Sequence, residues 1–140
     1  CIVMHPGDPD DLNGAGGDIL ERVRAFFEKK TTEAEQHGVN KNRLCFDPGI
    51  GFGKTNEENF ALIANPEKIR VPGTALLMAA SRKRVIGAVC GNPPFEDRMA
   101  GTVAAHTASV LFGADMVRAH DTFEAVQAAR VADAIKQFRK

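Results

Sequence analysis

The sequence predicts an α/β protein made of four consecutive parallel β/α units. Four times along the chain, an apolar run of strand length is followed by a polar, glycine-containing loop and then by a segment with helical periodicity. Strands that alternate with helices in this way are typical of a parallel sheet. Polar side chains follow each expected strand, at His5, Asp47, residues 81–83 and residues 118–120. In a barrel these positions share the rim at which active sites are built.

The first unit begins with a strand at residues 1–4 and continues, after a loop from residue 5 to residue 17, into a helix. Asp18 is expected to cap the start of that helix, and Gly38 to end it. Five apolar residues recur at helical spacing and predict its buried face: Ile19, Leu20, Val23, Phe26 and Phe27.

The second unit has a strand at residues 43–46, a glycine-rich loop, and a helix at residues 57–64 that Asn65-Pro66 is expected to end. In the third unit, a strand at residues 74–79 leads through a loop containing Pro93-Pro94 to a helix that ends at Gly113. One face of this helix is expected to carry Met99, Val103, His106 and Val110.

The fourth unit has a strand at residues 115–119 and a last helix capped by Thr122. An apolar stripe on that helix is expected to face the core, formed by Ala128, Val131, Ile135 and Phe138. No linker, low-complexity tract or sequence repeat interrupts the chain, so its 140 residues fit one domain.

Bulk composition excludes several classes of protein. Its 18 basic and 18 acidic residues cancel, which indicates neither a nucleic-acid surface nor a membrane surface. No apolar run approaches the roughly 20 residues that span a bilayer. The three cysteines, Cys1, Cys45 and Cys90, lack the spacing of a metal site, and a reducing, cytoplasmic compartment is expected. The abrupt, strand-like start suggests that upstream sequence is missing.

The most informative segment is Asp47-Pro48-Gly49-Ile50-Gly51-Phe52-Gly53-Lys54-Thr55. Glycine at every second position frees the backbone to adopt positive φ and to lie close to a ligand. The spacing fits neither the phosphate-binding P-loop nor the dinucleotide-binding fingerprint. Asp47 stands where a strand should end, so its carboxylate is able to accept two parallel N–H bonds from a guanidine-like edge. Asp-Pro-Gly is also ordinary turn chemistry, and a purely structural aspartate is the alternative.

Arg118 and His120 lie two residues apart on the last expected strand, so their side chains should point to the same side. A lone histidine near the end of a strand is more often structural. An arginine beside it at the same rim favours an anion-binding pair, because the planar guanidinium suits phosphate oxygens.

The glycine-rich segment, together with Ser81-Arg82-Lys83 and Val117-Arg118-Ala119-His120-Asp121, resembles three signatures of the dihydropteroate synthase family in the family's order. The resemblance covers nearly the whole chain. That family has a full (β/α)8 TIM barrel, and this chain is similar to its C-terminal half. The resemblance therefore implies a single pterin-binding-type domain over residues 1–140, with the N-terminal half absent.

By this resemblance the chain is part of a transferase of folate biosynthesis, which condenses dihydropterin pyrophosphate with p-aminobenzoate to give dihydropteroate and pyrophosphate. The implied pterin-binding residues are Asp47, Phe52, Lys83 and Met4. Arg118 and His120 are implied to bind the pyrophosphate, so the expected catalytic residues are Lys83, Arg118 and His120.

Ser81 and Arg84 are expected on the p-aminobenzoate side of the site. Arg84 stands where the family commonly has serine, and Ala79 where many members have glycine; two consequences stay open, a narrower pocket or a different hold on the second substrate. Outside the site, Lys54 is expected to be a solvated loop lysine. His37 and His106 are expected to be structural or superficial. His5 and Met4 correspond to a Met-His pair of the family, so for His5 a role at the site and a structural role both stay open.

The family resemblance also implies a magnesium ion, whose ligand is expected in the missing N-terminal half, with no metal ligand in this chain. Two alternatives remain open: another pterin-binding barrel, such as a methyltetrahydrofolate methyltransferase, or a non-catalytic half-barrel that binds a pterin.

Four units close only half of a barrel, so the 140 residues alone are expected to be inactive. They are expected to form a homodimer or a self-associating half-barrel, or else to be a piece of a larger ordered protein. Association would cover two sheet edges and the inward face of the sheet. The residues expected on that face are Val3, Leu44, Leu76 or Leu77, and Val117.

Overall fold

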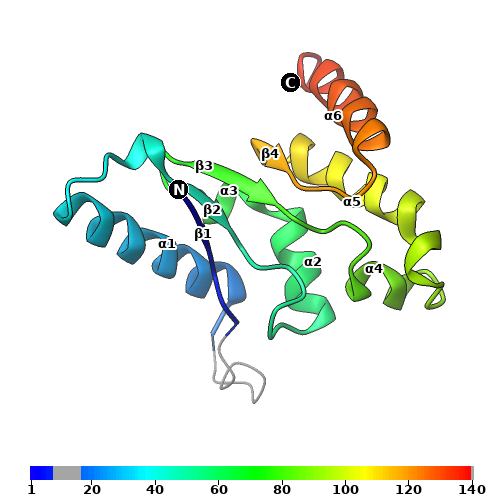
Figure 1. Ribbon diagram of the computed structural model, residues 1–140, viewed down its shortest axis with the longest axis horizontal. Helices are drawn as coiled ribbons and strands as arrows, with labels where there is room; N and C mark the ends of the chain where they lie inside the picture. Colours follow the sequence, from blue (N-terminus) through cyan, green and yellow to red (C-terminus); the bar gives the residue numbers. More distant parts are fainter. Residues whose placement is uncertain (8–16, 140) are drawn as a thin grey trace.

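The computed structural model describes residues 1–7 and 17–139, and its four parallel strands lie side by side in chain order (Figure 1). Most of the expected loop at residues 5–17 lies outside the described residues. The strands are β1 (Ile2–Met4), β2 (Cys45–Asp47), β3 (Ala75–Met78) and β4 (Met116–Val117), in the order β1-β2-β3-β4. Since every neighbouring pair is parallel, the predicted run of parallel β/α units is confirmed.

Helices follow each strand. The α-helices are α1 (Ile19–Gln36), α2 (Asn56–Ala64), α3 (Pro66–Ile69), α4 (Arg84–Val89), α5 (Met99–Leu111) and α6 (Thr122–Lys136), with 3₁₀ helices at Lys41–Arg43 and Phe95–Arg98. None of the helices in the described part of the chain has the length and apolar character needed to cross a membrane.

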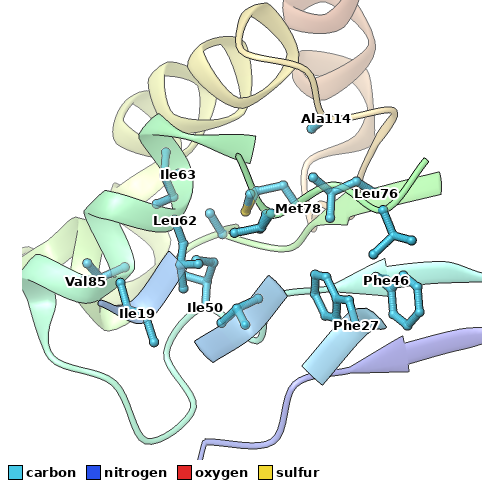
Figure 2. Close-up of a cluster of buried hydrophobic side chains, with 14 of the residues drawn as sticks. Ile19, Phe27, Phe46, Ile50, Leu62, Ile63, Leu76, Met78, Val85 and Ala114 are labelled. Carbon is cyan, nitrogen blue, oxygen red and sulfur yellow. The ribbon is translucent and has the colours of Figure 1, made fainter. Parts of the chain in front are cut away.

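The first helix was predicted well. The Asp18 side chain accepts the Leu20 N–H at 2.9 Å and caps α1, and Gly38 follows the helix with a φ of +77°. Phe27 is fully buried and stacks on Phe46 of β2, with ring centroids 4.5 Å apart. Figure 2 shows these two rings beside Leu76 and Met78 of β3. Aromatic and aliphatic side chains thus fill the space between the helices and one face of the sheet.

The side chains on the two faces of the sheet are not those that the sequence predicted, because the alternation along three of the strands is shifted by one residue. Val3, Leu44 and Leu76 pack into the core beneath the helices, and Val117 is paired in register with Met78, which lies in that same core. Because side chains alternate along a strand, the neighbouring residues face the other way. That opposite, barrel-interior face carries Cys45, Leu77, Ala79 and Ala75. Leu77 was therefore the correct choice of the two leucines, whereas Val3, Leu44 and Val117 were assigned to the wrong face.

The ends of several helices and strands also differ from the predicted ones. Arg43 lies in a 3₁₀ helix before β2, and α2 begins after Thr55, whose side chain and that of Glu58 form a reciprocal capping box. Asn65-Pro66 ends α2 as expected, but Pro66 also starts α3, which is compatible with proline at a first helical position. The short helix α4 was not predicted.

The buried faces of the last two helices were predicted only in part. In α5, His106 and Val110 are buried as expected, but Met99 is exposed and Thr102 and Ser109 are buried instead. In α6, Asp121 rather than Thr122 is the residue before the first turn. Its buried residues are Ala125, Ala128 and Ala132, while Val131, Ile135 and Phe138 are exposed. The small alanines allow close approach to neighbouring elements, which a count of large apolar residues does not reveal.

Candidate active site

The predicted site residues gather at the carboxyl ends of the strands. Asp47 ends β2, residues 81–83 follow β3, and residues 118–120 follow β4. A cavity of about 330 Å³ brings together residues from the last two of these segments: Ala79, Ser81, Lys83, Arg118, Ala119 and His120. All three expected catalytic side chains therefore line one cavity.

Beside this cavity, the glycine-rich loop adopts the backbone that its sequence predicts. Gly49, Gly51 and Gly53 have φ values of +71°, +81° and +59°. A Cβ atom on Gly49 would lie 2.2 Å from the carbonyl oxygen of His5, so only glycine allows the loop to pass this close to the end of β1.

Lys54 corrects the prediction of a solvated loop lysine. It is buried, and its Nζ donates to the carbonyl oxygens of Gly49 at 3.1 Å and Phe52 at 3.0 Å. Asn59 of α2 supports the same loop, because its Oδ1 accepts the N–H of Gly51 at 2.7 Å. In a loop of this shape, backbone N–H and C=O groups have no hydrogen-bond partner in a strand or helix. The buried side chains of Lys54 and Asn59 provide such partners.

Asp47 is almost fully buried, and its Oδ1 accepts the N–H of Gly49 at 2.8 Å. This bond is the turn contact that the structural alternative foresaw. The bond occupies one carboxylate oxygen, and the carboxylate charge opposes the burial that lowers the pKa of Lys83. Asp47 therefore both shapes the loop and supplies a negative charge at the rim.

Lys83 connects the two parts of the site. Its Nζ donates to the carbonyl oxygen of Ile50 and lies 4.8 Å from the centre of the Phe52 ring. Burial is the main influence and lowers the pKa of Lys83, Asp47 opposes that effect, and the positive charge of Arg118 lowers the pKa further. One ammonium group is thus influenced by both the glycine-rich loop and the arginine after β4.

Arg118 and His120 lie beyond β4, which ends at Val117, so the expected strand was too long. Both nevertheless line the same cavity. His120 is held by Ser81, whose Oγ accepts the His120 backbone N–H at 3.1 Å and lies 2.8 Å from its Nδ1. The structure therefore fixes the His120 imidazole at the edge of a cavity that Arg118 also lines.

The other expected site residues, Ser81, Arg84 and Met4, do not all line the same cavity. Ser81 lines the 330 Å³ cavity, whereas Arg84 begins α4 and lines a second pocket with Phe52; Lys83 lines both pockets. Met4 is half-buried and lies in register with Asp47 on the interior side of the sheet.

Of the other histidines, His37 is exposed, with its Nδ1 2.8 Å from the Glu33 carbonyl oxygen. His5 is buried with its ring edge-on to Phe26, at 5.0 Å between centroids. His106 is 1% exposed within α5. All three positions agree with structural or surface roles, and none lines the cavity.

The sequence analysis did not predict the ion pair that Arg82 and Asp121 form beside the site. The Arg82 Nε donates to Asp121 Oδ2 at 2.9 Å, and its Nη2 donates to Asp121 Oδ1. Arg82 also has a φ of +54°. Both residues belong to the recognised signatures, but their pairing across 39 positions depends on the packing of two loops.

Among residues 1–7 and 17–139, no group of three histidine, cysteine, aspartate or glutamate side chains is arranged to hold a metal ion. The cavity at the described part of the rim is lined by the cations Lys83 and Arg118 and by the His120 imidazole.

Comparisons with known proteins find relatives over nearly the whole chain. A family model for pterin binding enzymes matches residues 1–120. The dihydropteroate synthase of Synechocystis sp. is 36% identical over 137 residues, which cover 96% of this chain and 47% of that protein. The solved structure of Xanthomonas albilineans dihydropteroate synthase with 4-aminobenzoic acid matches with a TM-score of 0.86 at 35% identity, covering 99% of this chain and 50% of that one.

A second structure, Burkholderia cenocepacia dihydropteroate synthase complexed with 7,8-dihydropteroate, gives a TM-score of 0.86 at 34% identity, covering 97% of this chain and 52% of that one. The chain spans about half the length of these relatives. Fold and site thus define a protein with half of a (β/α)8 barrel, its C-terminal half as predicted, and a cavity lined by Lys83 and Arg118 at its rim. The chain belongs to the pterin binding enzyme family.

Proposed function

We propose that this chain supplies the C-terminal half of a dihydropteroate synthase site, with a pterin end and an anion end that meet at Lys83. The observation that carries this proposal is the position of Lys83, against Phe52 and Ile50 of the glycine-rich loop and in the same cavity as Arg118 and His120. A substrate that joins a flat heterocycle to a pyrophosphate would span these two ends.

At the pterin end, the Asp47 carboxylate would accept N–H bonds from the pyrimidine edge, while Met4 and Phe52 would lie along the ring system. Burial of Asp47 supports this role, because a charged hydrogen bond is stronger away from water. The Phe52 side chain is 45% exposed and so has a free face to offer a ring.

At the anion end, Arg118, His120 and Lys83 would stabilise the departing pyrophosphate. The C–O bond between the pterin's exocyclic methylene and the pyrophosphate breaks, the arylamine nitrogen of p-aminobenzoate bonds to that carbon, and the nitrogen loses a proton. Negative charge accumulates on the leaving group, so cations placed beforehand at the rim lower the barrier. No protein nucleophile is required.

The p-aminobenzoate side is proposed to involve Ser81 and Arg84. The Xanthomonas albilineans relative with 4-aminobenzoic acid supports this substrate class, and the Burkholderia cenocepacia relative with 7,8-dihydropteroate supports the product. A magnesium ion is proposed to take its ligand from the N-terminal half, as the family resemblance implies.

We further propose a single pterin-binding-type domain in a cytoplasmic protein whose half-barrel associates with itself or with an N-terminal half. Free thiols at Cys1, Cys45 and Cys90 support a reducing compartment. Association is supported by exposed apolar side chains on the two edge strands, where Ile2 is 62% exposed and Met116 41% exposed. On this proposal the 140 residues alone form no dihydropteroate.

Replacing Asp47 with alanine is expected to weaken pterin binding by about one to two orders of magnitude, because a buried charged hydrogen bond contributes about 1.5–3 kcal/mol. Isothermal titration of a pterin into the chain and into Asp47→Ala measures the effect. Asp133→Ala, which removes an exposed carboxylate from α6, is the matched control and should bind normally. Equal affinity of Asp47→Ala and the unmodified chain would refute the pterin end of the proposal.

Replacing Arg118 with lysine is expected to weaken pyrophosphate binding by about tenfold and to leave a phosphate-free pterin unaffected. Lysine keeps the charge but loses the planar fork that binds two phosphate oxygens together. Separate titrations with inorganic pyrophosphate and with the pterin distinguish the two effects, and Arg130→Lys on the exposed side of α6 is the control. Similar losses for both ligands would instead indicate a general folding defect. Pterin binding without any pyrophosphate binding in the unmodified chain would favour the non-catalytic alternative.

A further inference from the structure

Arg82 is held in an unusual backbone conformation by three separate elements. Its φ of +54° lies in the left-handed region, which costs free energy for a residue with a side chain. Its N–H donates to the Thr102 Oγ1 of α5 at 2.8 Å, and its carbonyl oxygen accepts from the Arg98 Nη1 at 3.2 Å. Its guanidinium makes the two bonds to Asp121 already described. Backbone and side chain are therefore both fixed.

This conformation sets the direction of the residues on either side. Ser81 precedes Arg82 and contacts His120 through its Oγ, while Lys83 follows and donates to the carbonyl oxygen of Ile50. A change of the Arg82 backbone would turn both neighbours away from their partners. The residue thus lies between the contact that holds His120 and the contact that holds Lys83.

A second line of contact runs through Phe95. The Arg82 guanidinium lies 5.2 Å from the centre of the Phe95 ring, and that ring lies edge-on to His120 with 5.3 Å between centroids. Arg82 and Asp121 are both largely buried, with side-chain exposures of 19% and 17%. Releasing the guanidinium would therefore remove support from the aromatic ring against which His120 packs.

We propose that Arg82 and Asp121 form a positioning pair that holds the loops after β3 and β4 together, and that Asp121 thereby strengthens anion binding although it is itself negatively charged. The inference deepens the proposed function and rests on the anion end of that site. In this proposal Arg82 binds Asp121 and not the substrate, because its Nε and Nη2 groups both donate to the Asp121 carboxylate.

The sign of one substitution separates positioning from simple electrostatics. Asp121 follows His120 directly, so its carboxylate repels an anion bound there, and its neutralisation would by charge alone tighten anion binding. Neutralisation would also free the Arg82 cation, which again favours an anion. Positioning predicts the opposite result, because the His120 imidazole and the Lys83 ammonium lose their fixed places.

The experiment is a calorimetric titration of inorganic pyrophosphate into the chain, into Asp121→Asn and into Asp133→Asn as the matched control on exposed α6. Asp121→Asn is expected to bind about three- to tenfold more weakly, in the range of couplings between residues of one hydrogen-bond network. Unchanged or tighter binding overturns the proposal. Should Asp121→Asn fail to fold, Arg82→Lys replaces it, and unfolding of both variants also overturns the proposal because the pair is then purely structural.

A double-mutant cycle tests whether Asp121 acts through His120. In a His120→Gln background, Asp121→Asn should have a clearly smaller effect, with only the part that acts through Lys83 left, whereas an equal loss in both backgrounds would mean a general defect and contradict the proposal.

An NMR readout needs no ligand. The ring-proton resonances of His120, shifted by the edge of Phe95, should move toward exposed values in Asp121→Asn. Absence of pyrophosphate binding by the unmodified chain would defeat the anion end of the proposed function, and this spectrum would still decide whether the pair positions His120.

Discussion

Replacing Gly49 with alanine is expected to destabilise the chain by about 2–4 kcal/mol and to abolish pterin binding. Two costs combine: the φ of +71° is unfavourable for alanine, and its Cβ would lie 2.2 Å from the backbone carbonyl oxygen of His5. That carbonyl cannot retreat easily, since the His5 N–H donates to the carbonyl oxygen of Asp47 at 2.9 Å. Urea unfolding at a fixed protein concentration measures the loss of stability.

Gly38 offers a matched control for this substitution. Its φ of +77° is nearly the same, but no atom lies within 4 Å of an added Cβ. Gly38→Ala should therefore show only the conformational cost of about 1 kcal/mol. If the two variants lose equal stability, the close approach of the loop to the end of β1 is not what selects glycine at position 49.

Acid is expected to destabilise the chain by about 3 kcal/mol through His106 alone. Burial lowers the pKa of this histidine from 6.5 to about 4 in the folded chain, and neither ring nitrogen has a hydrogen-bond partner among the described residues. Since one pKa unit is worth about 1.4 kcal/mol, the gap between the two values gives the size of the effect. The unfolded chain binds the proton more readily, so this contribution is complete above pH 6.5 and is lost as the pH falls toward 4.

His106→Leu removes the titrating group from the same buried position. The variant should lose this part of the dependence of stability on pH, and it should be clearly more stable than the unmodified chain at pH 4.5. His37→Gln changes an exposed histidine and should leave the acid destabilisation in place. Unfolding curves at pH 7, 5.5 and 4.5 provide the measurement. Parallel pH profiles for His106→Leu and the unmodified chain would show that His106 is not the group responsible.

Much of the site was predictable because its residues lie next to strong local signals. Asp47 ends an apolar strand and Lys83 and His120 follow two others, and strand order in a run of parallel β/α units brings such residues to one rim. The alternating glycines likewise required positive φ values, and all three have them. These features follow from short-range rules of strands, turns and helix caps.

The roles of Lys54, Arg82 and Asp121 were not predictable in this way. A lysine in a glycine-rich loop resembles a solvated lysine until its carbonyl partners are known, and Arg82 finds Asp121 only when two loops separated by 39 residues pack together. Side chains with long, flexible stems have many possible partners, and sequence spacing does not choose among them.

By itself, the sequence determined the alternation of strands and helices, the glycine-rich loop, and the position of the site at the ends of the strands, since these depend on periodicity and backbone geometry. Only the tertiary structure decided which face of each strand turned inward and which face of α6 was buried. A shift of one residue reverses a strand, so Val3 and Leu76 point to the helices rather than to the barrel interior. Alanines bury α6 while Val131 and Phe138 stay exposed, because the fit between packed surfaces, and not hydrophobicity alone, selects the contact.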